Sequence, residues 1–116
     1  GLAIFRRMSA SALMVFCTCP DRTTAEQLAT GLVAERLAAC VNLHAEVTSV
    51  YRWNDEVLQE PEALMMIKTT SARYPALQSW LQHRHPYDVP EIIAVPITAG
   101  AAPYLDWVNS CTSHTG

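Results

Sequence analysis

Cysteine side chains are the first residues of this chain whose type and spacing suggest chemistry. Cys17 and Cys19 lie two positions apart, in a short apolar run that ends at Pro20. Residues two apart on a strand point to the same side, so both thiols can reach one ion. Thiolates select copper(I) and zinc over hard cations. The alternative interpretation is that Cys17 is a small buried strand residue and that Cys19 enters the following turn.

Two histidines, His83 and His85, flank Arg84 where a helix is expected to end. Neutral imidazole is the commonest transition-metal ligand. A histidine in the last turn of a helix also interacts favourably with the helix dipole, and this interpretation suits His83. His85 is next to Pro86 in a loop, and we retain it as a candidate ligand.

The two remaining cysteines differ in their expected surroundings. Cys40 falls on the polar face of an alternating segment, whereas Cys111 falls on the apolar stripe of the last predicted helix and is expected in the core. The sequence has no CxxC pair followed by a second CxxC or HxxxH. A structural zinc site is therefore not predicted.

Catalysis would require a nucleophile, a base and an orienting acid. Cys17 and His85, with Asp88 or Glu91, are residue types that could fill these roles, but no motif in the sequence indicates that they do. The sequence contains no G-x-S-x-G elbow, no P-loop and no GxGxxG motif. We predict that the protein is not an enzyme, with no catalytic residues and no organic cofactor.

Composition narrows the classes of partner. The 116 residues suit one domain, half of them are hydrophobic, and the formal net charge is -3. Lys68 is the single lysine, so the basic face of a nucleic-acid binder is missing. No apolar run approaches the roughly 18 residues that a membrane span requires. We expect neither a nucleic acid nor a membrane as partner.

Four cysteines without a recognisable signal segment indicate reduced thiols and a cytoplasmic location. We predict a disordered N-terminal extension (residues 1–11), one folded domain (residues 12–112) and a short tail (residues 113–116).

Hydrophobic periodicity predicts four strands and three helices. A helix is expected over residues 23–37, where Thr23 and Glu26 form a capping box. From Val41 the odd-numbered residues as far as Trp53 are expected to share one face of a long strand. The other expected elements are strands at 12–18, 57–70 (interrupted near Pro61) and 92–97, a helix at 71–84, and a last helix that begins near Pro103.

This order predicts an α+β fold, a ferredoxin-like βαββαβ sandwich with a long second hairpin and an extra C-terminal helix. The first and third strands are expected at the centre of the sheet, and Pro96 marks the fourth as an edge strand. The hairpin is longer than such a sheet needs, and its unpaired edges indicate oligomerisation.

Four segments together resemble the CutA family, the divalent-ion-tolerance proteins. They are CTCPD (17–21), LAACVN (37–42), SVYRW (49–53) and HPYDVPE (85–91). The resemblance implies a homotrimer assembled through the hairpin and the last helix. It also implies that Cys17 and His85 bind copper or another divalent cation, with Cys40 as a further candidate. The sequence departs from the family at Arg84, where many relatives have histidine, and at Cys19, where a cysteine is unusual.

A second group of residues suggests a cleft between subunits. Tyr51 and Trp53 lie near the hairpin tip, and Tyr87 and Glu91 lie in the proline-bracketed loop. They are either interface anchors or a site for a small molecule or protein partner, as in the trimeric P-II-like signalling proteins of the same fold. We therefore predict a copper-binding homotrimer that acts in metal-ion tolerance, with a P-II-like scaffold as the alternative.

Overall fold

The computed structural model describes residues 11–113. The predicted extension and tail therefore lie outside the described residues, apart from Ser11 and Ser113. The elements follow the predicted order and are β1 (Ala12–Cys19), α2 (Arg22–Ala34), β2 (Cys40–Trp53), β3 (Glu56–Thr70), α3 (Tyr74–Arg84), β4 (Ile92–Pro96) and α4 (Ala102–Thr112).

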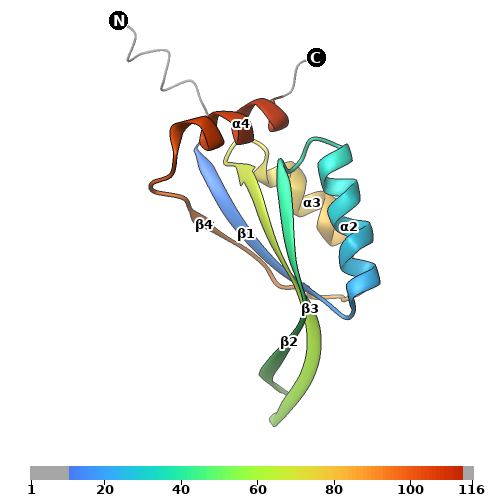
Figure 1. The fold of residues 1–116 in the computed structure, drawn as a ribbon. Helices are drawn as coiled ribbons and strands as arrows, with labels where there is room; N and C mark the ends of the chain where they lie inside the picture. Colours follow the sequence, from blue (N-terminus) through green and yellow to red (C-terminus); the bar gives the residue numbers. More distant parts are fainter. Residues whose placement is uncertain (1–10, 114–116) are drawn as a thin grey trace, which may run out of the picture.

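The four strands form one sheet in the order β2-β3-β1-β4, and every neighbouring pair is antiparallel. Helices α2 and α3 cover one face of this sheet (Figure 1). The predicted ferredoxin-like sandwich is confirmed, with β1 and β3 at its centre and Pro96 at the end of an edge strand. No helix within residues 11–113 is both long and apolar enough to cross a bilayer.

The core lies between the two helices and the central strands. Alternate residues of β1, beginning with Val15, point toward the helices and are fully buried. Leu32 of α2 and Leu81 of α3 pack in the same core cluster from the helix side and are also fully buried. The opposite face of the sheet is more open, since Ile93 is 53% and Val95 is 43% exposed.

Helix α2 begins one residue earlier than predicted, and the capping box is wrong. Asp21 is the N-cap residue, and its Oδ1 accepts a hydrogen bond of 2.8 Å from the backbone N–H of Thr24. That bond lowers the pKa of the Asp21 carboxyl group. Glu26 is paired with Arg22 instead of capping the helix. A short carboxylate directly before the helix therefore takes the capping role.

Helix α2 also ends earlier, at Ala34 instead of Leu37. Arg36 adopts a left-handed conformation with φ of 58°. The N–H of Arg36 then bonds to the carbonyl of Val33, and the N–H of Leu37 bonds to that of Leu32. This is a Schellman motif. Glycine is the usual residue at the left-handed position, so its absence concealed the helix end in the sequence.

The long hairpin carries a β-bulge that the periodicity did not reveal. His44 pairs with Leu64 and Val47 with Glu62, so Ala45 and Glu46 together stand opposite Ala63. The extra residue shifts the alternation, so the expected single face of odd-numbered residues is wrong beyond the bulge. The strand containing Pro61 is not interrupted, because Pro61 pairs with Thr48. Asn54 and Asp55 both have positive φ and form the predicted two-residue turn.

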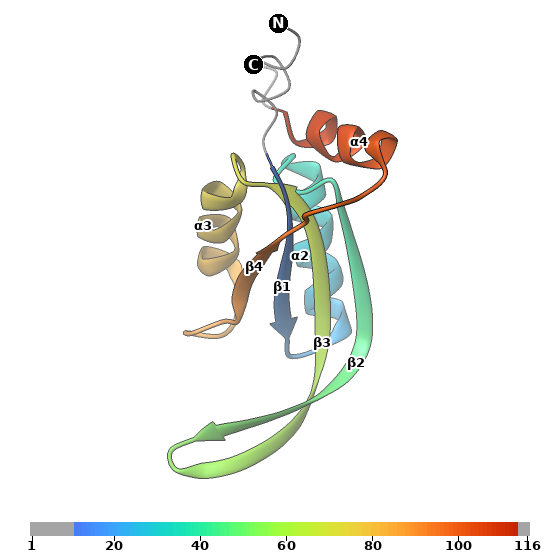
Figure 2. The same ribbon diagram turned by 90° about the vertical axis from the view of Figure 1, so that its left-hand side faces the viewer.

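Helix α4 lies at the end of the sheet opposite the hairpin tip (Figure 2). Its Val108 is fully buried, but Tyr104 and Trp107 remain 42% and 43% exposed. Cys111, expected in the core, is only half-buried. The apolar stripe of this helix is therefore only partly covered within the described chain.

Gly31 in α2 is required by packing. A Cβ atom at this position would lie 2.5 Å from the indole of Trp80 in α3. The indole is also covered by the Arg84 guanidinium, 4.3 Å from the ring centroid. Glycine therefore allows the two helices to approach each other, which explains its presence at a helical position that usually favours alanine.

We expect Gly31→Ala to destabilise the fold by about 1–2 kcal/mol, because overpacking outweighs the helix propensity gained. Urea unfolding followed by circular dichroism measures this. In a Trp80→Phe background the smaller ring should relieve the clash and remove most of the penalty. An equal penalty in both backgrounds would exclude the Trp80 contact as its cause.

Candidate metal centre

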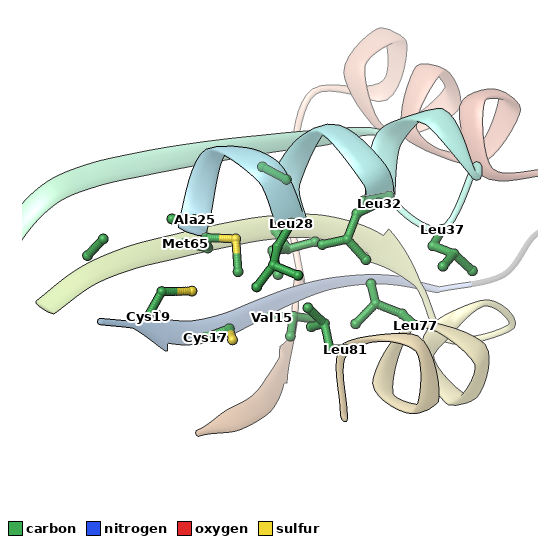
Figure 3. Packing of buried hydrophobic residues seen from close by; sticks show 14 residues of the cluster. Val15, Cys17, Cys19, Ala25, Leu28, Leu32, Leu37, Met65, Leu77 and Leu81 are labelled. Atoms are coloured by element: carbon green, nitrogen blue, oxygen red, sulfur yellow. The ribbon is translucent and has the colours of Figure 1, made fainter. Parts of the chain in front are cut away.

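Three metal-ligating side chains meet where β1 ends. The ligand atoms of Cys17, Cys19 and His85 all lie within 4.8 Å of one another. Both thiols are fully buried and His85 is 8% exposed. Figure 3 shows the two cysteines side by side on β1, under the end of α2 that carries Ala25.

Local structure positions each of these groups. Cys17 and Cys19 share the helix-facing side of β1, opposite Met65 and Ala63 of β3. His85 is the C-cap of α3, and its N–H donates to the carbonyl of Leu81 at 2.8 Å. Pro86 then turns the chain away from the helix. The end of α3 thus brings the imidazole to the end of β1.

Hydrogen bonds define the protonation of His85. Its Nε2 lies 2.8 Å from the Thr18 carbonyl, which can only accept. Its Nδ1 accepts from the backbone N–H of Tyr87 at 3.1 Å. The neutral ring therefore carries its proton on Nε2 and uses the Nδ1 lone pair. Nε2 also faces the Cys19 sulfur at 3.8 Å.

The two thiols differ in acidity. The neighbouring Cys17 thiol lowers the pKa of Cys19, although burial and the Glu62 and Asp21 carboxylates act in the opposite direction. The same contact with Cys19, followed by burial, raises the pKa of Cys17. Of the two thiols, Cys19 therefore loses its proton more readily than Cys17.

Cys40 lies elsewhere in the structure. It pairs with Lys68 of β3, whose ammonium group lies 3.9 Å from the Cys40 sulfur and also contacts Asn42. Lys68 itself pairs with Met14, three residues before Cys17 on β1. Within residues 11–113, the group of possible ligands contains Cys19 and does not contain Cys40.

The residues around His85 have structural contacts of their own. His83 is exposed, and its Nδ1 lies 2.7 Å from the Ser79 carbonyl in the last turn of α3, as expected of a residue at a helix end. Arg84, where the sequence departs from the pattern expected of the family, stacks on Trp80. Neither residue belongs to the group of ligands.

A hollow of about 660 Å³ adjoins the three candidate ligands. The four residues predicted to form a cleft between subunits, Tyr51, Trp53, Tyr87 and Glu91, all line this hollow of the single chain. Thr18 and Tyr87 line the hollow and also contact His85, so they form the wall between the hollow and the candidate ligands.

Two phenol–carboxylate contacts organise the hollow. The Tyr87 hydroxyl donates to Glu62 at 2.7 Å, and the Tyr51 hydroxyl donates to Glu60. Burial, followed by the bond to Glu62, raises the pKa of Tyr87. Glu60 and Glu62 were not among the predicted site residues. Their spacing of two on a strand was the available signal, because it directs both carboxylates to one side.

Comparison with known proteins identifies relatives along nearly the whole chain. Residues 13–111 match the model of the CutA1 divalent ion tolerance protein family. Mouse Protein CutA is 45% identical over 102 residues, which cover 88% of this chain and 58% of that protein. The chain thus spans somewhat more than half the length of the mammalian relatives it matches.

Solved structures agree with this match. A divalent cation tolerance protein (Cut A1) of Thermus thermophilus superposes with a TM-score of 0.86 at 44% identity, covering 88% of this chain and 99% of that one. A protein of Archaeoglobus fulgidus, described as a periplasmic divalent cation tolerance protein CutA, superposes with a TM-score of 0.85 at 29% identity, with the same coverage.

We expect His85→Ala to destabilise the metal-free protein by about 2 kcal/mol, because the Thr18 carbonyl and the Tyr87 N–H each lose a partner. Urea unfolding at a fixed protein concentration, with a metal chelator present, measures this. The control is His83→Ala, which removes an exposed imidazole and should change stability by less than about 0.5 kcal/mol. Equal effects of the two substitutions would contradict a structural role for His85.

Proposed function

This chain belongs to the CutA1 divalent ion tolerance family, and we propose that it binds copper at Cys17, Cys19 and His85, where the two thiols would hold the metal as copper(I). The observation that carries the proposal is the convergence of three buried ligand atoms within 4.8 Å. Two sulfurs and one imidazole nitrogen form a donor set that favours a soft ion over magnesium or calcium.

The acidic hollow supports the same proposal. Glu60, Glu62, Asp88 and Glu91 line it, and its lining includes no basic residue. A concave surface of one charge raises the local concentration of counter-ions. Cations would therefore collect next to Thr18 and Tyr87, which separate the hollow from the buried thiols.

Copper(I) titration in competition with a chelator, without oxygen, tests this site. Wild type should bind one copper(I) per chain, and Cys17→Ser or Cys19→Ser should weaken binding by about 100-fold, as expected when a ligand is lost. The matched control is Cys40→Ser, a half-buried cysteine outside the group, which should bind as wild type does. Unchanged affinity in Cys17→Ser/Cys19→Ser would refute the site, and loss in Cys40→Ser alone would transfer it to Cys40.

The functional assembly in this proposal is a homotrimer. Its support is the apolar surface that one chain leaves open. Val50, Trp53 and Val57 on the hairpin are 62%, 60% and 67% exposed. Strands β2 and β4 are the two edges of the sheet, and unpaired edges favour association. A second copy of the chain would cover these surfaces.

Light scattering after gel filtration at low micromolar concentration should give three times the mass of one chain. Replacing Val50 and Val57 by lysine should shift the protein toward monomers, because charges then enter the proposed contact. The matched control is Val89→Lys, also an exposed valine (82%), in the loop and not on the hairpin. A stable wild-type monomer would contradict the proposal.

A scaffold that binds a small molecule or a protein is the second candidate function. The hollow favours it, because Tyr51, Trp53 and Tyr87 supply aromatic surface beside carboxylates. The two functions differ in their dependence on Trp53, which lines the hollow without being one of the three ligands.

A cytoplasmic location is part of the proposal, and it rests on the free thiols of Cys17 and Cys19.

A further inference from the structure

We propose that the backbone N–H of Tyr87 acts as a gate on metal binding at His85, and that opening this gate reshapes the hollow. The inference rests on the proposed copper site. It assigns a positioning role to Tyr87, because the Tyr87 N–H donates to His85 Nδ1 and the metal-bound imidazole could not accept this hydrogen bond.

The His85 imidazole lies between one group that can only accept a hydrogen bond and one that can only donate. The Thr18 carbonyl, 2.8 Å from Nε2, has no hydrogen to donate. The Tyr87 N–H, 3.1 Å from Nδ1, has no lone pair with which to accept. A neutral imidazole has one N–H. Only the form with its proton on Nε2 satisfies both neighbours.

Metal coordination requires the opposite arrangement. Nε2 is the nitrogen that faces the thiols, since it lies 3.8 Å from the Cys19 sulfur. It can bind an ion only after its proton has left for solvent. The ring then remains neutral by taking a proton from solvent on Nδ1, so the imidazole gains and loses one proton. Nδ1–H would then point at the Tyr87 N–H, and two donors would face each other without an acceptor.

The conflict is relieved when the Pro86–Tyr87 peptide moves. Tyr87 is anchored at two points besides its backbone. Its hydroxyl donates to Glu62 at 2.7 Å, and its ring packs on the His85 ring with centroids 4.8 Å apart. Movement of the peptide therefore strains the bond to Glu62. Because Tyr87 and Glu62 both line the hollow, metal binding at His85 changes the wall of that hollow.

The coupling must operate in both directions. Anything that holds Tyr87 against Glu62 opposes metal binding, and anything that frees Tyr87 favours it. The structure contains a matched pair of contacts for testing this. Tyr87 and Tyr51 each donate from a phenol to a carboxylate of β3 in the same hollow, but only Tyr87 contacts His85.

The first experiment compares copper(I) affinities of the full chain in chelator competition. Tyr87→Phe keeps the backbone N–H and the ring but releases the loop from Glu62, so copper(I) should bind about fivefold more tightly. Tyr51→Phe removes the corresponding hydroxyl and should leave the affinity within about twofold of wild type. Equal affinities for Tyr87→Phe and wild type would overturn the coupling.

The second experiment observes the gate directly by nuclear magnetic resonance with one equivalent of copper(I), which is diamagnetic. The ring nitrogens of His85 should exchange roles, with Nδ1 becoming the protonated one, and the Tyr87 amide signal should shift. If copper(I) binds through the thiols while His85 keeps its proton on Nε2, the gate is overturned and the thiol site survives. If copper(I) does not bind at all, the proposed function itself fails.

Discussion

The antiparallel register between β1 and β3 determines which side chains lie beneath the helices and which face outward. Cys17 stands opposite Met65 and Cys19 opposite Ala63, so all four share the buried face. A slip of β1 by one residue would turn Cys17 and Cys19 to the other face of the sheet. The thiols would then leave His85, because the end of α3 fixes the imidazole on the helix side. The core and the candidate ligands therefore depend on the same pairing.

The bulge in β2 has a comparable effect on the hairpin. Before it, Val41 and Leu43 pair with Ile67 and Met65 and pack against the core. After it, Val47 pairs with Glu62, a residue that alternates with buried Ala63. The odd-numbered residues thereby change sides. Tyr51 and Trp53 consequently line the hollow together with Glu60, Glu62 and the loop after α3.

His85 connects the two regions, and its structural contacts would compete with metal binding at the proposed site. Its ring joins the end of β1, through Thr18, to the loop that begins at Pro86. These two hydrogen bonds stabilise the metal-free fold, yet both would have to break before Nε2 could bind an ion. The thiols need no change of tautomer, although they too must lose protons to bind an ion, and burial opposes this at Cys17. In the proposed site, Cys19 would add a ligand that needs no rearrangement of the loop.

Particular residues separate what the sequence determined from what required the tertiary structure. Local patterns were sufficient for the element order, the turn at Asn54 and the edge position of Pro96, because each follows from backbone preferences of neighbouring residues. The four residues predicted to form a cleft between subunits line one hollow of the single chain, and the cleft itself stays a prediction. The end of α2 was missed because Arg36 occupies a position usually held by glycine, and the bulge at Ala45 left no mark in the periodicity.

The sequence by itself also proposed Cys17 and His85 as partners, but it ranked Cys40 above Cys19 as the further ligand. Only the tertiary structure brought His85 within reach of both thiols and located Cys40 beside Lys68. The physical reason is that ligand grouping depends on distances between elements far apart in the chain, and Cys19 and His85 have a sequence separation of 66. Such distances, like the tautomer of His85, are set by strand register and helix ends that one-dimensional patterns do not encode.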